Sequence, residues 1–325
     1  MKIFSCFFGS IGLTYRDSKI KSSINPHNSS WIGSSMAVKK KPKAKKRISA
    51  KKPARKTSKP AFKSRNVPQI ENLLSEIEYG ESIAQYFDIL YPEEVLTRIQ
   101  AAFYEMIIRK YNVTSACDLA CRTGQTLKLL HKLGVKELAG VDVSPAMIAL
   151  SRKKLPKHVP LFVNDVYLAP HSVGDSKFDL VICTKDSLPM VLDDEALMNF
   201  FAQAWELLTD HGVLIVEMWN YEKIWRNKER FMPVMDRCTM KDSRLFFLEN
   251  DFHQELLVRN LVRLEKDKNE WSLRALSIPA RPVTRNEVEF FVKEAQFSKW
   301  GFLGSYSGGP YVPNESMYTI LIATK

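Results

Sequence analysis

Apolar residues recur at helical spacing between residues 81 and 111. The segment 81–91 and the longer segment 93–111 place apolar side chains at intervals of three and four residues, which predicts two amphipathic helices. The composition becomes typical of a globular protein from about residue 70. We therefore expect the folded part of the chain to begin there.

A different pattern follows after residue 111. Short apolar runs alternate with amphipathic segments. The segment that begins at Ser144 has the signature of a helix start, with Ser as the N-cap and Pro145 at the first helical position. Strands are expected at 115–119, 137–141, 160–163, 178–183 and 211–218, and helices at 123–133, from 144 and at 193–208. Alternating strands and helices predict a parallel sheet with helices on both faces.

The last third of the chain behaves differently. Residues 230–282 contain several β-rich runs with few helix signals, which predicts an antiparallel insertion. Thr284 and Glu287 form a capping-box pattern that opens a helix, and two closing strands are expected after it. We therefore expect one α/β domain over residues 70–325, with a β-rich insertion or lid over 226–282.

The net charge of +12 is unevenly distributed. Residues 1–70 hold 18 Lys and Arg and one acidic residue and carry +17, whereas the rest hold 30 Lys and Arg and 35 acidic residues and carry −5. Residues 37–66 have almost no large apolar groups and cannot bury enough surface to fold. We predict a disordered basic tail over residues 1–69. Met36 is an ordinary protein start, so we expect residues 1–35 not to be translated.

Two interpretations of residues 37–66 stay open. The first is a tether that contacts nucleic acid non-specifically, because neutralising phosphates with Lys and Arg releases counterions. The second is a solubilising extension without a partner. No aromatic residue interleaves the basic run between residues 37 and 61, so stacking on bases is not indicated.

The composition also bears on compartment and metals. No stretch approaches the roughly 18 consecutive apolar residues that a membrane-spanning helix needs, so no membrane contact is predicted. The five cysteines are scattered and none has zinc-ligand spacing, which predicts an intracellular protein without a metal. We expect a cytoplasmic protein, with nucleoid or nuclear association if the tail binds nucleic acid.

One short stretch carries the chemistry. Residues 116–124 (Ala-Cys-Asp-Leu-Ala-Cys-Arg-Thr-Gly) describe a strand that ends in Asp118, a tight turn and the start of a helix. The next strand ends in a second acid, Asp142. Acids at the carboxyl edge of a parallel sheet are typical of nucleotide binding, and Asp142 suits a bidentate grip on ribose hydroxyls. Because the chain has neither G-x-G-x-x-G nor a P-loop, a nucleoside without phosphates fits better than a dinucleotide.

The same stretch resembles the first motif of class I S-adenosylmethionine-dependent methyltransferases, which is close to D-L-(G/A)-C-G-T-G. Segments at 140–147, 162–166, 178–183 and 207–217 resemble further motifs in the family's order. Residues 184–190 (Thr-Lys-Asp-Ser-Leu-Pro-Met) are similar to the D-S-L-N-Y-L segment of a subgroup of small bacterial methyltransferases. The resemblance implies a Rossmann-like, seven-stranded methyltransferase sheet and S-adenosyl-L-methionine as the cofactor.

The resemblance also implies roles for individual residues. Asp118 would lie near the amino-acid end of the cofactor, Asp142 would hold the ribose, and Asp165 would accept the adenine amino group. The residues implied to contact the cofactor are Tyr86, Asp118, Ala120, Cys121, Gly124, Asp142, Val143, Met147, Asp165, Val166 and Cys183. A turn, loop or helix cap is the alternative for each acid, and Met147 is equally well explained as core.

One position departs from the family motif. Arg122 stands where the family usually has Gly, at a place that often needs an unusual backbone or a close approach of the cofactor. If the φ of Arg122 is negative, the side chain is harmless and can reach the cofactor carboxylate. If the φ is positive, we expect weakened cofactor binding, and a non-catalytic protein becomes an alternative.

Five residues are expected on the substrate side. By resemblance, Lys185 and Asp186 would face the substrate, and either Tyr86 or Tyr91 would close over the cofactor. Trp219 and Tyr311 are aromatic candidates for the acceptor pocket. Asp186 is the candidate general base. Exposed loop charges and ordinary packing are the alternatives for these side chains.

Three functions follow from these observations. The leading one is an S-adenosylmethionine-dependent methyltransferase that transfers a methyl group to nitrogen or oxygen of a small-molecule acceptor by in-line displacement. The second is a methyltransferase that acts on a nucleic-acid-associated macromolecule and is tethered by the basic tail. The third is a non-catalytic DNA-binding protein with a degenerate cofactor pocket.

Overall fold

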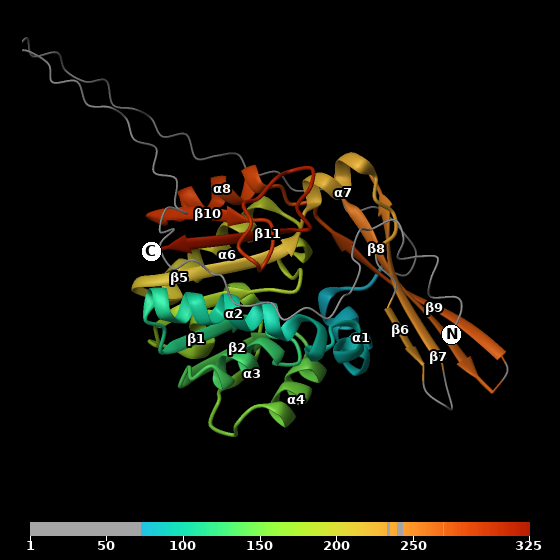
Figure 1. Cartoon of the computed structure of the whole chain (residues 1–325), viewed down its shortest axis with the longest axis horizontal. Coiled ribbons are helices and arrows are strands. Elements are labelled where there is room, and N and C mark those ends of the chain that lie inside the picture. The colour runs from blue at the N-terminus through green and yellow to red at the C-terminus, as the bar shows by residue number, and fades with distance from the viewer. Residues whose placement is uncertain (1–72, 233–234, 239–242, 269) are drawn as a thin grey trace, which may run out of the picture. The chain divides into compact units, whose positions relative to one another are not determined.

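The structure of the chain, a computed structural model, describes residues 73–232, 235–238, 243–268 and 270–325 (Figure 1). The expected basic tail over residues 1–69 lies outside them. Within the described residues the chain forms one sheet of seven strands and a second sheet of four. The two parts of the predicted fold, a mainly parallel sheet and an antiparallel insertion, are therefore both present.

The larger sheet has the strand order β10–β11–β5–β4–β1–β2–β3. Its strands are β1 (Ser115–Leu119), β2 (Glu137–Asp142), β3 (Leu161–Val163), β4 (Phe178–Cys183), β5 (Leu208–Trp219), β10 (Lys299–Leu303) and β11 (Tyr318–Thr324). β1 pairs in parallel with both β2 and β4, whereas β11 runs antiparallel to β5 and β10. The predicted Rossmann-like sheet is thus confirmed. The strand order reverses at β1, and ligands of such sheets bind at the carboxyl ends of the strands next to this switch point.

Helices cover both faces of the larger sheet. One face carries α2 (Glu93–Tyr111), α3 (Gln125–Lys132) and α4 (Pro145–Lys154), and the other carries α5 (Ala169–Val173), α6 (Asp194–Leu207) and α8 (Arg285–Glu294). Neighbouring strand residues point to opposite faces, so Ala116 and Leu180 pack with the first group while Cys117 and Val181 pack with the second. Among the described helices, none combines the length and apolar character needed to cross a membrane.

The helix starts follow the predicted capping residues. The Oγ of Ser144 accepts a hydrogen bond from the backbone N of Met147 at 3.2 Å, with Pro145 in the first turn of α4. Thr284 and Glu287 form the reciprocal capping box that opens α8. Such caps satisfy backbone N–H groups that have no partner within the helix, and they fix where each helix begins.

The insertion is a four-stranded antiparallel meander. Its strands are β6 (Met235–Cys238), β7 (Ser243–Phe252), β8 (Leu257–Asp267) and β9 (Glu270–Ala280). Helix α1 (Glu76–Leu90) lies between this sheet and α4 (Figure 1). Phe87 of α1, Met147 of α4, Phe246 of β7 and Ile278 of β9 share one apolar cluster. The insertion is therefore held against the larger sheet partly through α1.

Some elements were not expected from the sequence. α1 begins before residue 81, because Ser75 and Glu78 form a capping box in front of it. Short helical segments are also added at α5, α7 (Tyr221–Asn227), η1 (Val166–Leu168) and η2 (Leu188–Met190). Segments of two turns or less show no clear 3.6-residue periodicity, so the pattern of apolar positions does not reveal them.

Candidate functional site

Two buried acids lie at the ends of neighbouring strands, as the sequence predicts. Asp118 in β1 and Asp142 at the end of β2 are each 2% exposed. The Oδ2 of Asp142 accepts a hydrogen bond from the backbone N of Arg122 at 2.8 Å, and its Oδ1 accepts one from the backbone N of Ser144 at 2.9 Å. Among the described residues, Oδ1 of Asp118 has no hydrogen-bond partner. The β2 carboxylate is therefore fixed in place beside β1.

The turn between β1 and α3 has an unusual backbone. Ala120, Arg122 and Gly124 have φ of 64°, 55° and 75°. The left-handed region costs a residue with a side chain roughly 1–2 kcal/mol and persists where the surroundings enforce it. The hydrogen bond from the backbone of Arg122 to Asp142 is one such restraint. The φ of Arg122 is thus positive, and weakened cofactor binding stays the sequence-based prediction for this case.

A pocket opens at this edge of the sheet, and we call it the carboxylate pocket. Its wall carries three acids, Glu76, Asp142 and Asp165, and one cation, Arg122. The space between its walls, including open solvent at its mouth, is about 500 Å³. The lining residues are Glu76, Gly80, Ala120, Arg122, Asp142, Val143, Asp165, Val166, Cys183, Ser187, Leu188, Met190, Val191 and Phe200. Ionised carboxylates only accept hydrogen bonds, so this wall suits a ligand rich in hydroxyl or amino donors.

Helix α1 closes one side of the carboxylate pocket with Glu76 and Gly80, which lie one turn apart. A Cβ added at Gly80 would lie 2.8 Å from the Cβ of Ser144, so glycine permits the close approach of α1 to α4. The Oε1 of Glu81 accepts hydrogen bonds from the Oγ of Ser144 at 2.7 Å and the backbone N of Ala146 at 2.8 Å. Burial raises the pKa of Glu76 to about 7, so its charge changes near neutral pH.

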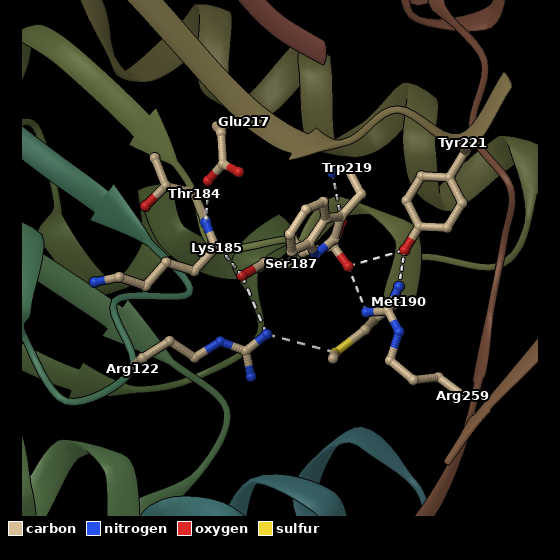
Figure 2. A network of polar contacts seen from close by, with 10 residues as sticks. Arg122, Thr184, Lys185, Ser187, Met190, Glu217, Trp219, Tyr221 and Arg259 are labelled. Carbon is tan, nitrogen blue, oxygen red and sulfur yellow. Dashed lines mark hydrogen bonds and ion pairs between the residues drawn. The ribbon is translucent and has the colours of Figure 1, made fainter. Parts of the chain in front are cut away.

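The turn after β4 holds a second group of buried charges (Figure 2). Lys185 and Asp186 are both left-handed, with φ of 56° and 62°. The Oδ1 of Asp186 accepts a hydrogen bond from the backbone N of Trp219 at 3.0 Å, and Oδ2 accepts one from the hydroxyl of Tyr221 at 2.8 Å. The guanidinium of Arg259, on β8, forms an ion pair with the same oxygen. Burial raises the pKa of Asp186, and the ion pair with Arg259 counteracts this rise. Because Arg259 lies in β8, the ion pair also links the insertion to the β4 turn.

Lys185 also belongs to a buried polar cluster behind the turn. Its backbone N donates to Oε2 of Glu217 at 2.7 Å, and the hydroxyl of Tyr306 donates to the same oxygen at 3.3 Å. Burial raises the pKa of Glu217 to about 7. Burial also lowers the pKa of the Lys185 ammonium and raises that of Asp118, while their mutual attraction counteracts both shifts. Several groups at this edge therefore titrate closer to neutral pH than in water.

A second pocket is lined by residues of α1, the β4 turn and the insertion, and we call it the cation pocket. Its wall carries three cations, Arg122, Lys185 and Arg259, and one acid, Asp186. The space between its walls, including open solvent at its mouth, is about 400 Å³. The other lining residues are Tyr79, Ile83, Phe87, Leu90, Tyr91, Met190 and Leu248. Arg122 and Met190 line both pockets, so their side chains form the wall between the two.

Many residues that the sequence singled out come together here. Six of the eleven implied cofactor residues line the carboxylate pocket, namely Ala120, Asp142, Val143, Asp165, Val166 and Cys183. Tyr91, Lys185 and Asp186 line the cation pocket. Of the remaining cofactor residues, Asp118, Cys121 and Met147 are buried, and Gly124 is the N-cap of α3. Their individual contacts with a cofactor stay predictions.

Like those four residues, three further predicted residues lie outside both pockets. The ring of Tyr86 packs under the guanidinium of Arg263, whose Cζ is 4.4 Å from the ring centroid. The ring of Trp219 packs on a tyrosine of β11 with centroids 5.0 Å apart. The hydroxyl of Tyr311 donates to Oδ1 of Asn220 at 2.8 Å. These contacts correspond to the packing alternatives that the sequence left open.

Sequence reasoning missed the residues that close the two pockets. Glu76 and Gly80 come from α1, Ser187 and Met190 from the segment after β4, and Arg259 from the insertion. The apolar face of α1 indicates that the helix packs, but not what it packs against. The pattern in β8 likewise gives no sign that Arg259 meets Asp186, because their contact depends on how the insertion folds back.

The described residues give little indication of metal or thiol chemistry. Among them, no group of three or more His, Cys, Asp and Glu residues is arranged to hold a metal ion. Cys117, Cys121 and Cys183 are buried and free, and burial raises the pKa of each thiol. A protonated, buried thiol is a poor nucleophile and a poor metal ligand. Carboxylates and cations therefore dominate the chemistry of this site.

Comparisons with known proteins agree with this geometry. Residues 116–212 match the sequence model of a family described as a methyltransferase domain. A protein of Geobacillus sp. (strain WCH70), whose name marks its methyltransferase activity as unproven, is 28% identical over 144 residues. That match covers 42% of this chain and 56% of the relative, so the chain spans little more than half of the relative's length.

Solved structures share the fold. An S-adenosylmethionine-dependent methyltransferase from Clostridium acetobutylicum ATCC 824 has a TM-score of 0.61 at 19% identity, covering 75% of this chain and 97% of that chain. The sugar N-methyltransferase KedS8 from Streptoalloteichus sp ATCC 53650 also has a TM-score of 0.61, at 18% identity, covering 82% and 99%. At these identities the likeness speaks for the fold. By sequence, residues 116–212 are thus similar to a methyltransferase domain, and the fold is that of solved S-adenosylmethionine-dependent methyltransferases.

Proposed function

We propose that the protein binds S-adenosylmethionine in the carboxylate pocket and methylates a nitrogen or oxygen of a small molecule bound in the cation pocket. The observation that carries this proposal is the shared wall of Arg122 and Met190 between the two pockets. Methyl transfer requires a donor and an acceptor to meet, and adjoining pockets at a switch point provide for that. KedS8, which shares the fold, is described as a sugar N-methyltransferase, and a small polar acceptor is compatible with this proposal.

The residues of the carboxylate pocket fit this cofactor. Two backbone N–H groups hold the carboxylate of Asp142, and its remaining lone pairs can accept ribose hydroxyls. The acidic wall of Glu76, Asp142 and Asp165 favours a ligand that carries positive charge, as the sulfonium and the ammonium do.

The chain contributes alignment of the reacting groups. The cofactor supplies the methyl group on a positively charged sulfur, and in-line displacement needs the reacting atoms to be held in line. The turns that carry Arg122 and Lys185 have restrained left-handed backbones, so the side chains of this site project from fixed positions. Leu248 and Arg259 bring the insertion into the wall of the cation pocket.

A nitrogen or oxygen acceptor also has to lose a proton. Asp186 was the base expected from the sequence, but both of its carboxylate oxygens accept hydrogen bonds, and one is paired with Arg259. These contacts support an anchoring role for Asp186. Lys185 lines the same pocket, and burial lowers the pKa of its ammonium. However, its Nζ donates to the Oγ1 of Thr126 at 3.4 Å and is attracted to Asp118, which favours the charged ammonium, so we assign proton removal to neither residue.

Calorimetric titration of S-adenosylmethionine into the full chain tests the cofactor site. Wild-type protein should bind, and Asp142→Ala should bind about 10- to 100-fold more weakly, because it removes hydrogen bonds to a charged group. Asp175→Ala, which removes an exposed acid away from both pockets, is the matched control and should bind like wild type. A folded wild-type protein that does not bind would overturn the proposal and favour the non-catalytic alternative.

Product formation tests the acceptor class. The full chain is incubated with S-adenosylmethionine and either a panel of small amines, amino sugars and hydroxyl compounds or a panel of nucleic acids and basic proteins. We expect S-adenosylhomocysteine to form with members of the first panel. Turnover with the second panel alone would contradict a small-molecule acceptor and favour a tethered macromolecular methyltransferase.

A further inference from the structure

We propose that Arg122 binds the α-carboxylate of the cofactor at the wall between the carboxylate pocket and the cation pocket. This inference rests on the proposed function, since it takes S-adenosylmethionine as the ligand. The family motif has glycine at this position, so the motif assigns no role to the side chain. The sequence predicts weakened cofactor binding at the positive φ that Arg122 has, and the proposal replaces that prediction because of where the side chain lies. The argument depends on where the guanidinium lies and on what it contacts.

The guanidinium is enclosed between the two pockets. Arg122 is 8% exposed, and its backbone N is tied to Asp142. Its side chain extends from the turn after β1 toward Ser187 and Met190 (Figure 2). Nη2 donates to the Oγ of Ser187 at 3.1 Å and contacts the Sδ of Met190 at 3.5 Å. The charge therefore stands at the one wall that both ligands would share.

Its present contacts do not satisfy this charge. A guanidinium has five N–H donors, and a thioether sulfur is a weak acceptor. Among the described residues, Nε of Arg122 has no hydrogen-bond partner. Neither Ser187 nor Met190 is an anion, and the Phe87 ring, whose centroid lies 5.9 Å from Cζ of Arg122, offers a cation–π contact but no anion. A buried cation without an anion in contact is strongly unfavourable, so the site is short of a negatively charged group at this point.

The surrounding acids act on Arg122 at longer range. Arg122 lowers the pKa of Glu76, Asp118 and Asp186, in each case against a larger rise caused by burial. Asp186 is paired with Arg259, so its charge is already balanced. The nearby acids therefore compensate the charge of Arg122 in part and fill none of its hydrogen-bond positions.

The charges of the ligand point to the same residue. S-adenosylmethionine carries a sulfonium, an ammonium and a carboxylate. The acidic wall of the carboxylate pocket favours the two cationic groups and repels the carboxylate. Among the residues that line this pocket, Arg122 is the cation, so a carboxylate is best placed against it. The planar fork of a guanidinium matches the two oxygens of a carboxylate, which a glycine at this position could not bind.

A comparison of two ligands tests this assignment by calorimetry on the full chain. The first is S-adenosylhomocysteine, and the second is its decarboxylated analogue, which keeps the adenosine, the thioether and the amine. Wild-type protein should prefer the first ligand by about 10- to 100-fold, the usual effect of a hydrogen bond to a charged group. Arg122→Gln should weaken binding of S-adenosylhomocysteine until the preference disappears, whereas Arg122→Lys should keep part of it.

The matched control is Arg263→Gln, which removes an arginine that packs on Tyr86 outside both pockets and should leave the preference unchanged. Thermal melting shows that each variant is folded. A preference that survives in Arg122→Gln would overturn the proposal. Tighter binding of both ligands to Arg122→Gln would also overturn it, because the side chain would then obstruct the site. Wild-type protein that binds neither ligand would remove the proposed function itself and this inference with it.

Discussion

The two pockets share Arg122 and Met190 but are built in opposite ways. The wall of the carboxylate pocket has three acids and one cation, and most of it comes from turns that follow strands of the larger sheet. The wall of the cation pocket has three cations and one acid, and most of it comes from α1, the β4 turn and the insertion. One pocket is therefore assembled from short local motifs and the other from distant parts of the chain.

The contacts of these charges differ as well. In the carboxylate pocket, Asp142 is held by backbone N–H groups, which leaves its charge available to a ligand. In the cation pocket, Arg259 is paired with Asp186, and Lys185 is attracted to Asp118. The comparison teaches that the number of charges in a wall does not define its ligand. Two of the three cations of the cation pocket, Arg259 and Lys185, interact with acids of the protein itself. The third cation is Arg122.

Breaking the buried pair should have the largest effect. Arg259→Leu leaves Asp186 buried without its cation, and loss of one partner of such a pair lowers the free energy of unfolding by about 3–5 kcal/mol. Urea unfolding of the full chain measures the change. Binding of S-adenosylhomocysteine should change far less, because Arg259 does not line the carboxylate pocket.

The double variant Arg259→Leu with Asp186→Asn separates an unpaired charge from lost packing. It should recover much of the stability, since no unpaired carboxylate remains. A loss of less than about 1 kcal/mol in the single variant would contradict a buried pair, because that is the usual value of an exposed one.

This comparison also explains how much the sequence could reveal. The capping residues Ser144 and Thr284 and the alternation of strands and helices were enough to predict the larger sheet. Asp142 could be predicted because a strand, an acid and a turn follow one another in the chain. Most residues of the carboxylate pocket can therefore be predicted from short stretches of consecutive sequence.

The cation pocket could not be predicted to the same extent. Arg259 lies in β8, in which buried and exposed positions do not alternate regularly, and its partner Asp186 is far away in the sequence. Tyr86 and Tyr91 share a helix end, yet Tyr91 lines the cation pocket and Tyr86 packs on β8. Such differences depend on the register of the insertion against α1, which no local pattern encodes.

The buried acid behind the β4 turn gives the next largest effect, and it depends on pH. Glu217 is 5% exposed, and burial raises its pKa from 4.5 to about 7. In this range the folded state holds a proton that the unfolded state has released, so the free energy of unfolding falls as pH rises. Relative to Glu217→Gln, wild-type protein should lose up to about 3 kcal/mol between about pH 4.5 and pH 7.

Urea unfolding of both proteins across this range measures the difference. Lys185, Asp186 and Tyr306 face Glu217 and are present in both proteins, so their titration largely cancels. Parallel curves for wild type and Glu217→Gln would show that this carboxyl titrates as it does in water. A confirmed slope would place a carboxyl that titrates near neutral pH directly behind Lys185, which lines the cation pocket.

A smaller effect is expected for a glycine substitution of Arg122. It separates the backbone strain at this residue from its proposed role in binding the carboxylate. Arg122→Gly removes a side chain from a left-handed residue and should raise the free energy of unfolding by up to about 1 kcal/mol. Ala120→Gly relieves the same kind of strain at a φ of 64° and is the matched control. Both variants should unfold at slightly higher urea concentration, but Arg122→Gly alone should lose the preference for the carboxylate-bearing ligand. A destabilised Arg122→Gly would show that the guanidinium is needed for folding.

The smallest effect is expected for a substitution of Tyr86. It separates the two interpretations of this residue, contact with the cofactor and packing against the insertion. Tyr86→Leu removes a ring that packs under Arg263, and exposed cation–π contacts are worth about 0.5–1 kcal/mol, so urea unfolding should show a loss of that size. Binding of S-adenosylhomocysteine should not change, because Tyr86 lines neither pocket. Tyr91→Leu, at the end of the same helix, is the control within the cation pocket. If Tyr86→Leu instead weakened binding tenfold or more, the ring would have to close over the cofactor as the family resemblance implies, and α1 would have to turn on ligand binding.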